Sequence, residues 1–437
     1  MFSTSVGLAG IVILFVLLAI GLHLGAAFIL VGGVGLILLM GWRGALNIIG
    51  SAPFAFASSY NLSPLPLFLL MGAFAESGGF GATVFEAVSK WAGKIPGALA
   101  VASTMGNAFF GVASGSSLAA TAIFARVALP QMLRRNYNKS LAAGCIACAG
   151  TFSTMIPPSA GLMLYAILTE QPIAIVFMAG LVPGSITALV YTASIIIRAV
   201  RNPKLAPIIS ESYTWRTKVH STLDIWPIIV LGFLVLGGIL LGWFTATEAG
   251  AVGALGALII AMILRGVWGA RIPRALMTCM KTVGMIFLII IGAIIFARFL
   301  SVTQIPTHLA SFLSGLALPR VAILAGFLLM YFVLGMFMGP LEIMVITIPV
   351  VIPVIIHLGY NPIWFGIVLT KMCEIGLVTP PVGPNVFVVS AASDGQVSLI
   401  DAFKGVVPFI ICDLFVLVLL VAFPDIVLFL PNLIFKS

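Results

Sequence analysis

Residues 376–385 read Gly-Leu-Val-Thr-Pro-Pro-Val-Gly-Pro-Asn, and residues 150–159 read Gly-Thr-Phe-Ser-Thr-Met-Ile-Pro-Pro-Ser. Each stretch interrupts an apolar run long enough to cross a bilayer. A proline pair removes two backbone donors and prevents a continuous helix. Inside a membrane, irregular backbone is tolerated only where it lines a cavity or is buried in protein. The two stretches therefore predict membrane helices that are broken at a functional site.

The composition indicates that most of the chain lies in a bilayer. Of its 437 residues, 62% are hydrophobic and 8% are charged, whereas soluble domains carry about 25% charged residues. The apolar stretches are long and do not alternate with period two, which favours helices over a barrel. We predict an all-α polytopic membrane protein with about 10 transmembrane spans and two re-entrant helical hairpins.

The predicted elements follow the apolar runs. Each hairpin segment, 96–134 and 319–357, is long enough to cross twice but has Gly and polar residues near its middle. The broken spans cover 140–170 and 363–392. The continuous spans are predicted at Val6–Ile20, Leu24–Met40, Leu62–Ser77, Ile175–Ile197, Ile225–Gly242, Glu248–Leu264, Thr282–Leu300 and Gly405–Phe423.

The two halves of the chain resemble each other. A shift of 223 residues places Pro96 on Pro319, Tyr137 on Tyr360, and Pro157-Pro158 on Pro380-Pro381 without a gap. We predict two repeats, residues 1–198 and 225–437, joined by a linker at 199–224. Each repeat holds five crossings, an odd number, so the second enters from the opposite side. Such inverted-topology repeats recur in secondary transporters.

The distribution of basic residues tests this topology. If the linker is cytoplasmic, 15 Lys and Arg face the cytoplasm, and Arg43, Arg298, Arg320 and Lys436 fall on the other side. This bias follows the positive-inside rule. It places both termini outside, which is the periplasm for the bacterial or archaeal cytoplasmic membrane that we expect. It also explains the net charge of +9 without nucleic acid as a partner.

The breaks and the hairpin tips supply candidate ligands for ions. An unwound helix frees carbonyl oxygens, which suit Na⁺, and exposes amides and a positive helix end, which suit a carboxylate. One tip facing one break would form one Na⁺ site, the repeat would form a second, and the anion would lie between them. The candidate Na⁺ ligands are Ser114, Gly115, Ser116, Ser153, Thr154 and Pro157 in the first repeat, and Gly339, Gly376, Thr379 and Pro380 in the second. The candidate substrate-binding residues are Ser116, Ser117, Ser159, Gly383 and Asn385.

Other polar residues in the apolar runs are weaker candidates. Glu342 follows the second tip and would ligate a cation, carry a proton or form a salt bridge. Arg298 and Arg126 would meet a substrate carboxylate or snorkel to an interface. Lys371 and Glu374 are spaced to pair on one helix face, and Asp413 would be a relay. The cysteines and histidines form no zinc set, and no P-loop pattern is present, so we expect neither an enzyme nor an ATPase.

At these motifs the sequence resembles the large membrane subunit of TRAP transporters, the tripartite ATP-independent periplasmic type. The resemblance covers nearly the whole chain. The residues that carry it are Pro66-Leu67-Phe68, Gly115-Ser116-Ser117, Ile156-Pro157-Pro158-Ser159, Ala179–Gly184, Phe365-Gly366 and Ile375–Gly383. It implies a Na⁺-coupled elevator whose cation residues correspond to Gly115–Ser117 with Ser153–Pro158, and to Gly339 with Gly376, Thr379 and Pro380.

The resemblance also implies partners and substrates. The partners are a small four-helix membrane subunit, expected here as a separate polypeptide, and a periplasmic substrate-binding protein. The substrates are small carboxylates. Na⁺ is expected at two or more sites, with no organic cofactor. The alternatives are a stand-alone Na⁺/carboxylate symporter of the same wider fold and a passive channel; the matched breaks favour alternating access over a channel.

Overall fold

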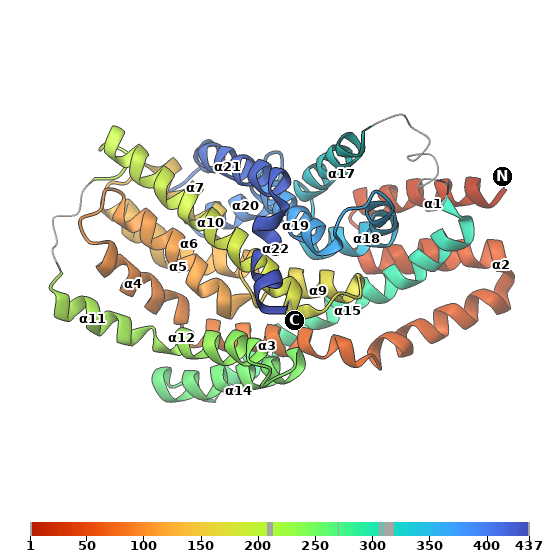
Figure 1. Cartoon of the computed structure of the whole chain (residues 1–437), viewed down its shortest axis with the longest axis horizontal. Helices are drawn as coiled ribbons and strands as arrows, with labels where there is room; N and C mark the ends of the chain where they lie inside the picture. Colours follow the sequence, from red (N-terminus) through yellow and green to blue (C-terminus); the bar gives the residue numbers. More distant parts are fainter. Residues whose placement is uncertain (1, 208–212, 270, 306–307, 309–318, 436–437) are drawn as a thin grey trace.

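The chain is described by a computed structural model that covers residues 2–207, 213–269, 271–305, 308 and 319–435. These residues form helices and turns and contain no strand. The predicted all-α class is therefore confirmed for the described part of the chain. Figure 1 shows an elongated bundle in which the broken helices lie near the centre. The two helical hairpins, residues 98–134 and 320–357, lie on either side of this centre.

The helices of the N-terminal half end with a long helix that leads into the linker. They are α1 (Phe2–Ala19), α2 (Leu24–Ala57), η1 (Tyr60–Leu62), α3 (Pro64–Ser77), α4 (Phe80–Ala92), α5 (Ala98–Ser114), α6 (Ser117–Arg134), α7 (Lys139–Ala149), α8 (Phe152–Met155), α9 (Ala160–Leu168) and α10 (Ile173–Arg201).

The C-terminal half begins with a helix inside the predicted linker. Its elements are α11 (Trp215–Asp224), α12 (Trp226–Gly232), η2 (Phe233–Gly237), α13 (Gly238–Leu240), α14 (Ala246–Arg265), α15 (Arg271–Thr303), α17 (Arg320–Gly335), α18 (Pro340–His357), α19 (Pro362–Val378), α20 (Pro384–Ala391), α21 (Leu399–Ala422) and α22 (Pro424–Phe435).

The helices are long and apolar enough for a multi-pass membrane protein. Within the described residues, seven stretches could each cross a bilayer, and nine could if each of two bent helix pairs counts as one span. The bent pairs are α3 with α4, at 64°, and α11 and α12 with their continuation to Leu240, at 50°. The predicted total of about ten spans is not decided by helix length and stays a prediction.

Several helices extend beyond the predicted spans. The chain stays helical past Met40 to Ala57, with a kink at Gly41, whose backbone has φ 75° and ψ 170°. The amphipathic helix α4 follows α3, and the short helix α22 follows α21. These segments are too short or too polar to stand out as membrane spans, so hydropathy alone does not reveal them.

Close packing between α2 and α15 relies on glycine. A Cβ on Gly32 would lie 2.9 Å from Cα of Phe296, and a Cβ on Gly292 would lie 2.5 Å from the carbonyl oxygen of Gly25. Small residues allow such close approach of helix backbones in membranes. Together with α3 and α14, which also pack on each other, these helices form a framework beside the hairpins (Figure 1).

Candidate functional site

The first hairpin turns at Gly115 and Ser116. Gly115 ends α5 with φ 62°, a left-handed conformation that glycine adopts at no steric cost. Ser116 then caps α6, because its hydroxyl accepts a hydrogen bond from the amide of Ala119 at 3.4 Å. The carbonyl oxygen of Pro158 lies 3.4 Å from the point where a Cβ on Gly115 would stand. The tip of the hairpin therefore rests against the first Pro-Pro break, as the sequence predicts.

The first break separates α7 from α9, with the single turn of α8 between them. All residues from Thr151 to Ala160 are buried. The Ser159 hydroxyl donates to the carbonyl of Thr154 at 2.6 Å and accepts from the amide of Leu162 at 3.3 Å. Ser159 thus both caps α9 and fixes the unwound segment. This bonding occupies a hydroxyl that the sequence assigns to the substrate.

The second break separates α19 from α20. The Thr379 hydroxyl donates to the carbonyl of Ile375 at 2.6 Å, and Gly383 has a positive φ of 56° immediately before α20. Thr379 is half-buried, whereas Pro380 and Pro381 are exposed. The bonds Pro157-Pro158 and Pro380-Pro381 are both cis.

The second hairpin contacts this break through Met336. The amide of Gly383 donates to the carbonyl of Met336 at 3.3 Å. A Cβ on Gly376 would lie 2.5 Å from the backbone of Gly335 and 3.0 Å from the amide nitrogen of Met336. Gly339, a candidate Na⁺ ligand, lies beside the carboxylate of Glu342. The sequence did not single out Met336, because a backbone contact leaves no trace in side-chain chemistry.

Candidate residues from opposite halves of the chain also meet. The side-chain amide of Asn385, at the start of α20, donates to the Ser117 hydroxyl at 2.8 Å and to the carbonyl of Ala147 at 3.0 Å. Both side chains are buried. The structure therefore brings together two of the predicted substrate-binding residues, one from the first hairpin and one from the second break.

The oxygens near the first break suit a hard cation. Among the described residues, the Ser153 hydroxyl and the Asn385 side-chain carbonyl are buried without a hydrogen-bond partner. Buried polar atoms are nearly always satisfied, so each such exception needs an explanation. Hydroxyl and carbonyl oxygens are the ligands that alkali and alkaline-earth cations prefer. Ser153 is a candidate Na⁺ ligand from the sequence, and its unused hydroxyl fits that role.

The sequence matches a known protein family over most of its length. The family model for the tripartite ATP-independent periplasmic transporter, DctM component, matches residues 11–426. The chain belongs to this family. A relative from Pseudomonas aeruginosa, the C4-dicarboxylate TRAP transporter large permease protein DctM, is 33% identical over 405 residues, covering 90% of this chain and 93% of the relative.

Two further proteins place this DctM-family chain among its neighbours. The isethionate TRAP transporter permease protein DctMQ of Oleidesulfovibrio alaskensis is 30% identical over 415 residues, which cover 94% of this chain and 63% of that longer protein. The crystal structure of the YdaH transporter of Alcanivorax borkumensis superposes with a TM-score of 0.63 at 14% identity, covering 89% and 90% of the two chains. The latter similarity concerns the fold alone.

Three weaker candidates differ in their distance from the hairpin tips, since Glu342 lies beside Gly339 of the second tip. Arg126 on α6 and Arg298 on α15 are exposed, and Glu342 in the first turn of α18 is half-buried. Arg298 and Glu170 line a cavity of about 1210 Å³ between α2, the α9–α10 junction, the α13–α14 junction and α15. The residues that line this cavity include none of the other candidate ligands.

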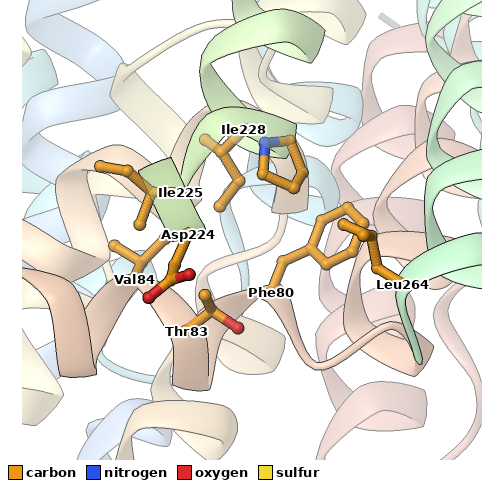
Figure 2. A pocket seen from close by; sticks show the side chains of 8 residues that line it. Phe80, Thr83, Val84, Asp224, Ile225, Ile228 and Leu264 are labelled. Carbon is orange, nitrogen blue, oxygen red and sulfur yellow. The ribbon is translucent and has the colours of Figure 1, made fainter. Parts of the chain in front are cut away.

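A second hollow lies at the bent helix pairs. Figure 2 shows Phe80, Thr83 and Val84 of α4 facing Asp224, Ile228 and their neighbours, with Leu264 of α14 at one side. Its volume is about 20 Å³, room for about one water molecule. It is therefore too small for an organic acid.

Buried charges near the first break are another feature that the sequence analysis anticipated only in part. Lys371 pairs with Glu374, as their spacing on α19 predicts, at 3.3 Å. Lys371 also pairs with Asp413 of α21 at 2.7 Å, and the Tyr191 hydroxyl donates to Asp413 at 2.5 Å. No local pattern in the sequence indicates that α19, α21 and α10 meet at this point. Tyr191 and Asp413, for example, are 222 residues apart.

Proposed function

We propose that this DctM-family chain is the large membrane subunit of a secondary active importer that moves a small organic acid with Na⁺. The observation that carries the proposal is the position of the two proline breaks within a membrane protein of this family. Each break lies against the tip of its hairpin, through Gly115 and Pro158 in one half and Met336 and Gly383 in the other. Free carbonyls, hydroxyls and helix ends converge there, as ion sites require.

Na⁺ would bind at the two tip-and-break pairs. In the first, Ser114, Gly115, Ser116, Ser153, Thr154 and Pro157 would supply oxygens, and the unpartnered Ser153 hydroxyl supports this choice. In the second, Gly339, Gly376, Thr379 and Pro380 would do so. Inward movement of one positive charge down 100 mV releases about 2.3 kcal/mol. Two or more Na⁺ per monoanion would therefore draw on the membrane potential as well as the Na⁺ gradient.

The contacts around the two breaks support an inverted repeat. Gly111 of α5 packs on Ser153, and Gly335 of α17 packs on Gly376, in pairs whose positions differ by 224 and 223 residues. Asn138 and Asn361, which are 223 residues apart, each cap the helix that leads to a break. In addition, α6 packs on α20 while α18 packs on α9. Each hairpin thus contacts the downstream half of the other broken span.

This arrangement supports an elevator mechanism. The hairpins and broken helices would move as one body, because each part is held by a member of the other half. The remaining helices, with α2, α3, α14 and α15 among them, would form the scaffold. Gly72 of α3 marks the boundary, because a Cβ there would lie 2.6 Å from the carbonyl oxygen of Ser114. A contact without a protruding side chain, as at Gly72, would permit one body to slide past the other.

The proposed topology gives the solute a route from the periplasm. Arg298, Glu170 and Thr245 line the large cavity, and all three lie at helix ends that the positive-inside rule places outside. A periplasmic binding protein would release the solute there, and a small membrane subunit would complete the transporter. Arg298 would attract the acid toward the cavity. From there the acid would reach mid-depth, where it would be surrounded by Asn385, Ser117, Ser159 and Gly383.

The substrate class rests on the related proteins and on the helix ends. The two relatives are named for a C4-dicarboxylate and for isethionate, both small organic anions. The N-termini of α9 and α20 present positive dipole ends that suit such anions. Because the relative named for a C4-dicarboxylate is the more similar of the two, and isethionate is a sulfonate, we propose a small carboxylate as the solute.

Uptake into proteoliposomes tests the proposal. The transporter is reconstituted with its small subunit, and accumulation of labelled C4-dicarboxylate is measured with its binding protein present, under an inward Na⁺ gradient. We expect accumulation that stops when choline replaces Na⁺ and that falls sharply without the binding protein. Full uptake without Na⁺ would refute the coupling. Undiminished uptake without the binding protein would indicate a stand-alone symporter, and ionic current without accumulation would indicate a channel.

A further inference from the structure

Three charged side chains are buried where the two halves of the chain meet. Lys371, Glu374 and Asp413 have exposed fractions of 0–1% and are the only charged residues among the described ones that are buried to this degree. The Lys371 ammonium lies 2.7 Å from Asp413 and 3.3 Å from Glu374. We refer to these three residues as the ion cluster. It combines one positive charge with two carboxylates.

The contacts of both carboxylates with Lys371 and with hydroxyl groups favour their ionised forms. Asp413 accepts from the Tyr191 hydroxyl at 2.5 Å, in addition to its contact with Lys371. Glu374 accepts from Lys371 through one oxygen and lies 2.6 Å from the Thr154 hydroxyl through the other. Donors directed at a carboxylate favour its charged form. With both carboxylates ionised, the ion cluster carries a net charge of −1, and an uncompensated buried charge is costly.

The Thr154 hydroxyl connects the ion cluster to the first break. Its oxygen lies 2.6 Å from Glu374 and 2.5 Å from the carbonyl oxygen of Thr151. A hydroxyl has one hydrogen, so it cannot donate fully to both acceptors. The neighbouring Ser153 hydroxyl is buried without a partner among the described residues. This place is rich in oxygen, short of hydrogen-bond donors and next to a net negative charge.

We propose that Lys371, Glu374 and Asp413 are positioning residues for a Na⁺ that binds at the first break. The net negative charge of the ion cluster attracts this Na⁺ through Glu374 and Thr154. One bound Na⁺ makes the ion cluster and its surroundings neutral. Lys371 is required because, without it, two buried carboxylates would repel each other. The inference rests on the proposed Na⁺ coupling. It adds that the charge that attracts Na⁺ comes from the ion cluster, whose residues belong to neither set of candidate Na⁺ ligands.

A series of charge variants tests this inference. Glu374→Gln and Asp413→Asn each bring the ion cluster to zero net charge, and the double variant brings it to +1. Thr370→Val is the matched control, because Thr370 is buried on the same helix and its hydroxyl bonds only to the carbonyl of Gly366 among the contacts described. Na⁺ binding is measured on the purified transporter from the rise in melting temperature with NaCl, with choline chloride as the reference.

The apparent Na⁺ affinity should follow the net charge. We expect Glu374→Gln to weaken Na⁺ binding by about tenfold or more, since a unit charge at close range in a protein contributes at least that much. Asp413→Asn should weaken it less, because Asp413 lies behind Lys371, and the double variant should weaken it most. Thr370→Val should bind Na⁺ as the native protein does.

The outcomes separate this inference from the proposed function. Native Na⁺ affinity in folded Glu374→Gln, or lower melting temperatures across the series with unchanged Na⁺ affinity, would overturn the inference and leave a merely structural cluster. If Glu374→Gln does not fold, an unchanged affinity in Asp413→Asn overturns it equally. No Na⁺-induced shift in the native protein, together with uptake that needs no Na⁺, would instead refute the proposed coupling itself.

Discussion

The two proline breaks share a sequence pattern but differ in their surroundings. Residues Thr151–Ala160 of the first break are all buried, and Ser159 and Thr154 hold the unwound chain by side-chain hydrogen bonds. In the second break, Pro380 and Pro381 are exposed. The same local chemistry thus gives one closed break, in which every residue is buried, and one open break, in which both prolines are exposed. Under the proposed transport function, alternating access would make use of such an asymmetry, since only one side of a transporter opens at a time.

Alanine substitutions at the helix crossings should have the largest effect. A Cβ on Gly376 would lie 2.5 Å from the Gly335 backbone, whereas a Cβ on Gly111 would lie 3.3 Å from Cα of Ser153. We expect Gly376→Ala to destabilise the fold by about 3 kcal/mol or to prevent folding, and Gly111→Ala to cost about 1 kcal/mol. Folded yield and melting temperature in detergent measure both.

Gly326→Ala is the control for these substitutions. Gly326 lies on the same helix as Gly335, and a Cβ there would meet nothing within 4 Å. It should leave melting temperature unchanged or slightly raised, because alanine is the better helix former. A loss at Gly326 as large as that at Gly376 would mean that the close crossing is not the cause.

Thiol labelling should distinguish the closed break from the open one. Cysteine at position 381 should react with a water-soluble maleimide faster than cysteine at 159 by about tenfold or more, because thiol reactivity requires exposure. The background chain should lack Cys412, since Cys145, Cys148, Cys279 and Cys373 are buried. Equal rates at the two positions would contradict the difference between the breaks.

Hydroxyl deletions should give the smallest effects and the clearest functional contrast. Ser159→Ala removes the cap of α9 and the bond to Thr154, so we expect a loss of about 1–2 kcal/mol. Thr379→Ala removes one bond to a nearby carbonyl and should scarcely affect stability. It should instead raise the Na⁺ concentration needed for half-maximal uptake. If Thr379→Ala alters stability more than Na⁺ dependence, the second break has a structural role.

The sequence predicts the breaks well because proline acts locally. Pro157-Pro158 and Pro380-Pro381 interrupt hydrogen bonding whatever surrounds them, and helices end in the segments that contain them. Glycine at position 115 likewise predicts a turn. By contrast, α4 and α22 depend on packing against neighbours, and their composition resembles that of loops and short apolar tails.

The ion cluster marks the limit of sequence reasoning. The spacing of Lys371 and Glu374 predicts their pairing on one helix. The partners Asp413, Tyr191 and Thr154 come from α21, α10 and α8, and only the fold brings them together. The difference between a closed and an open break is equally a property of the conformation, so no local pattern encodes it.

The bridge from Asn385 to Ser117 and Ala147 has a consequence for how this family changes over time. The side-chain amide of Asn385 donates to a hydroxyl 268 residues away. Asn385 cannot be replaced freely, because loss of this amide leaves buried polar groups without a hydrogen-bond partner. Substitutions at 385 should therefore be accompanied by substitutions at 117 in related sequences. Spatial contact of this kind is a physical cause of covariation. Positions 117 and 385 would therefore covary although they lie in different repeats.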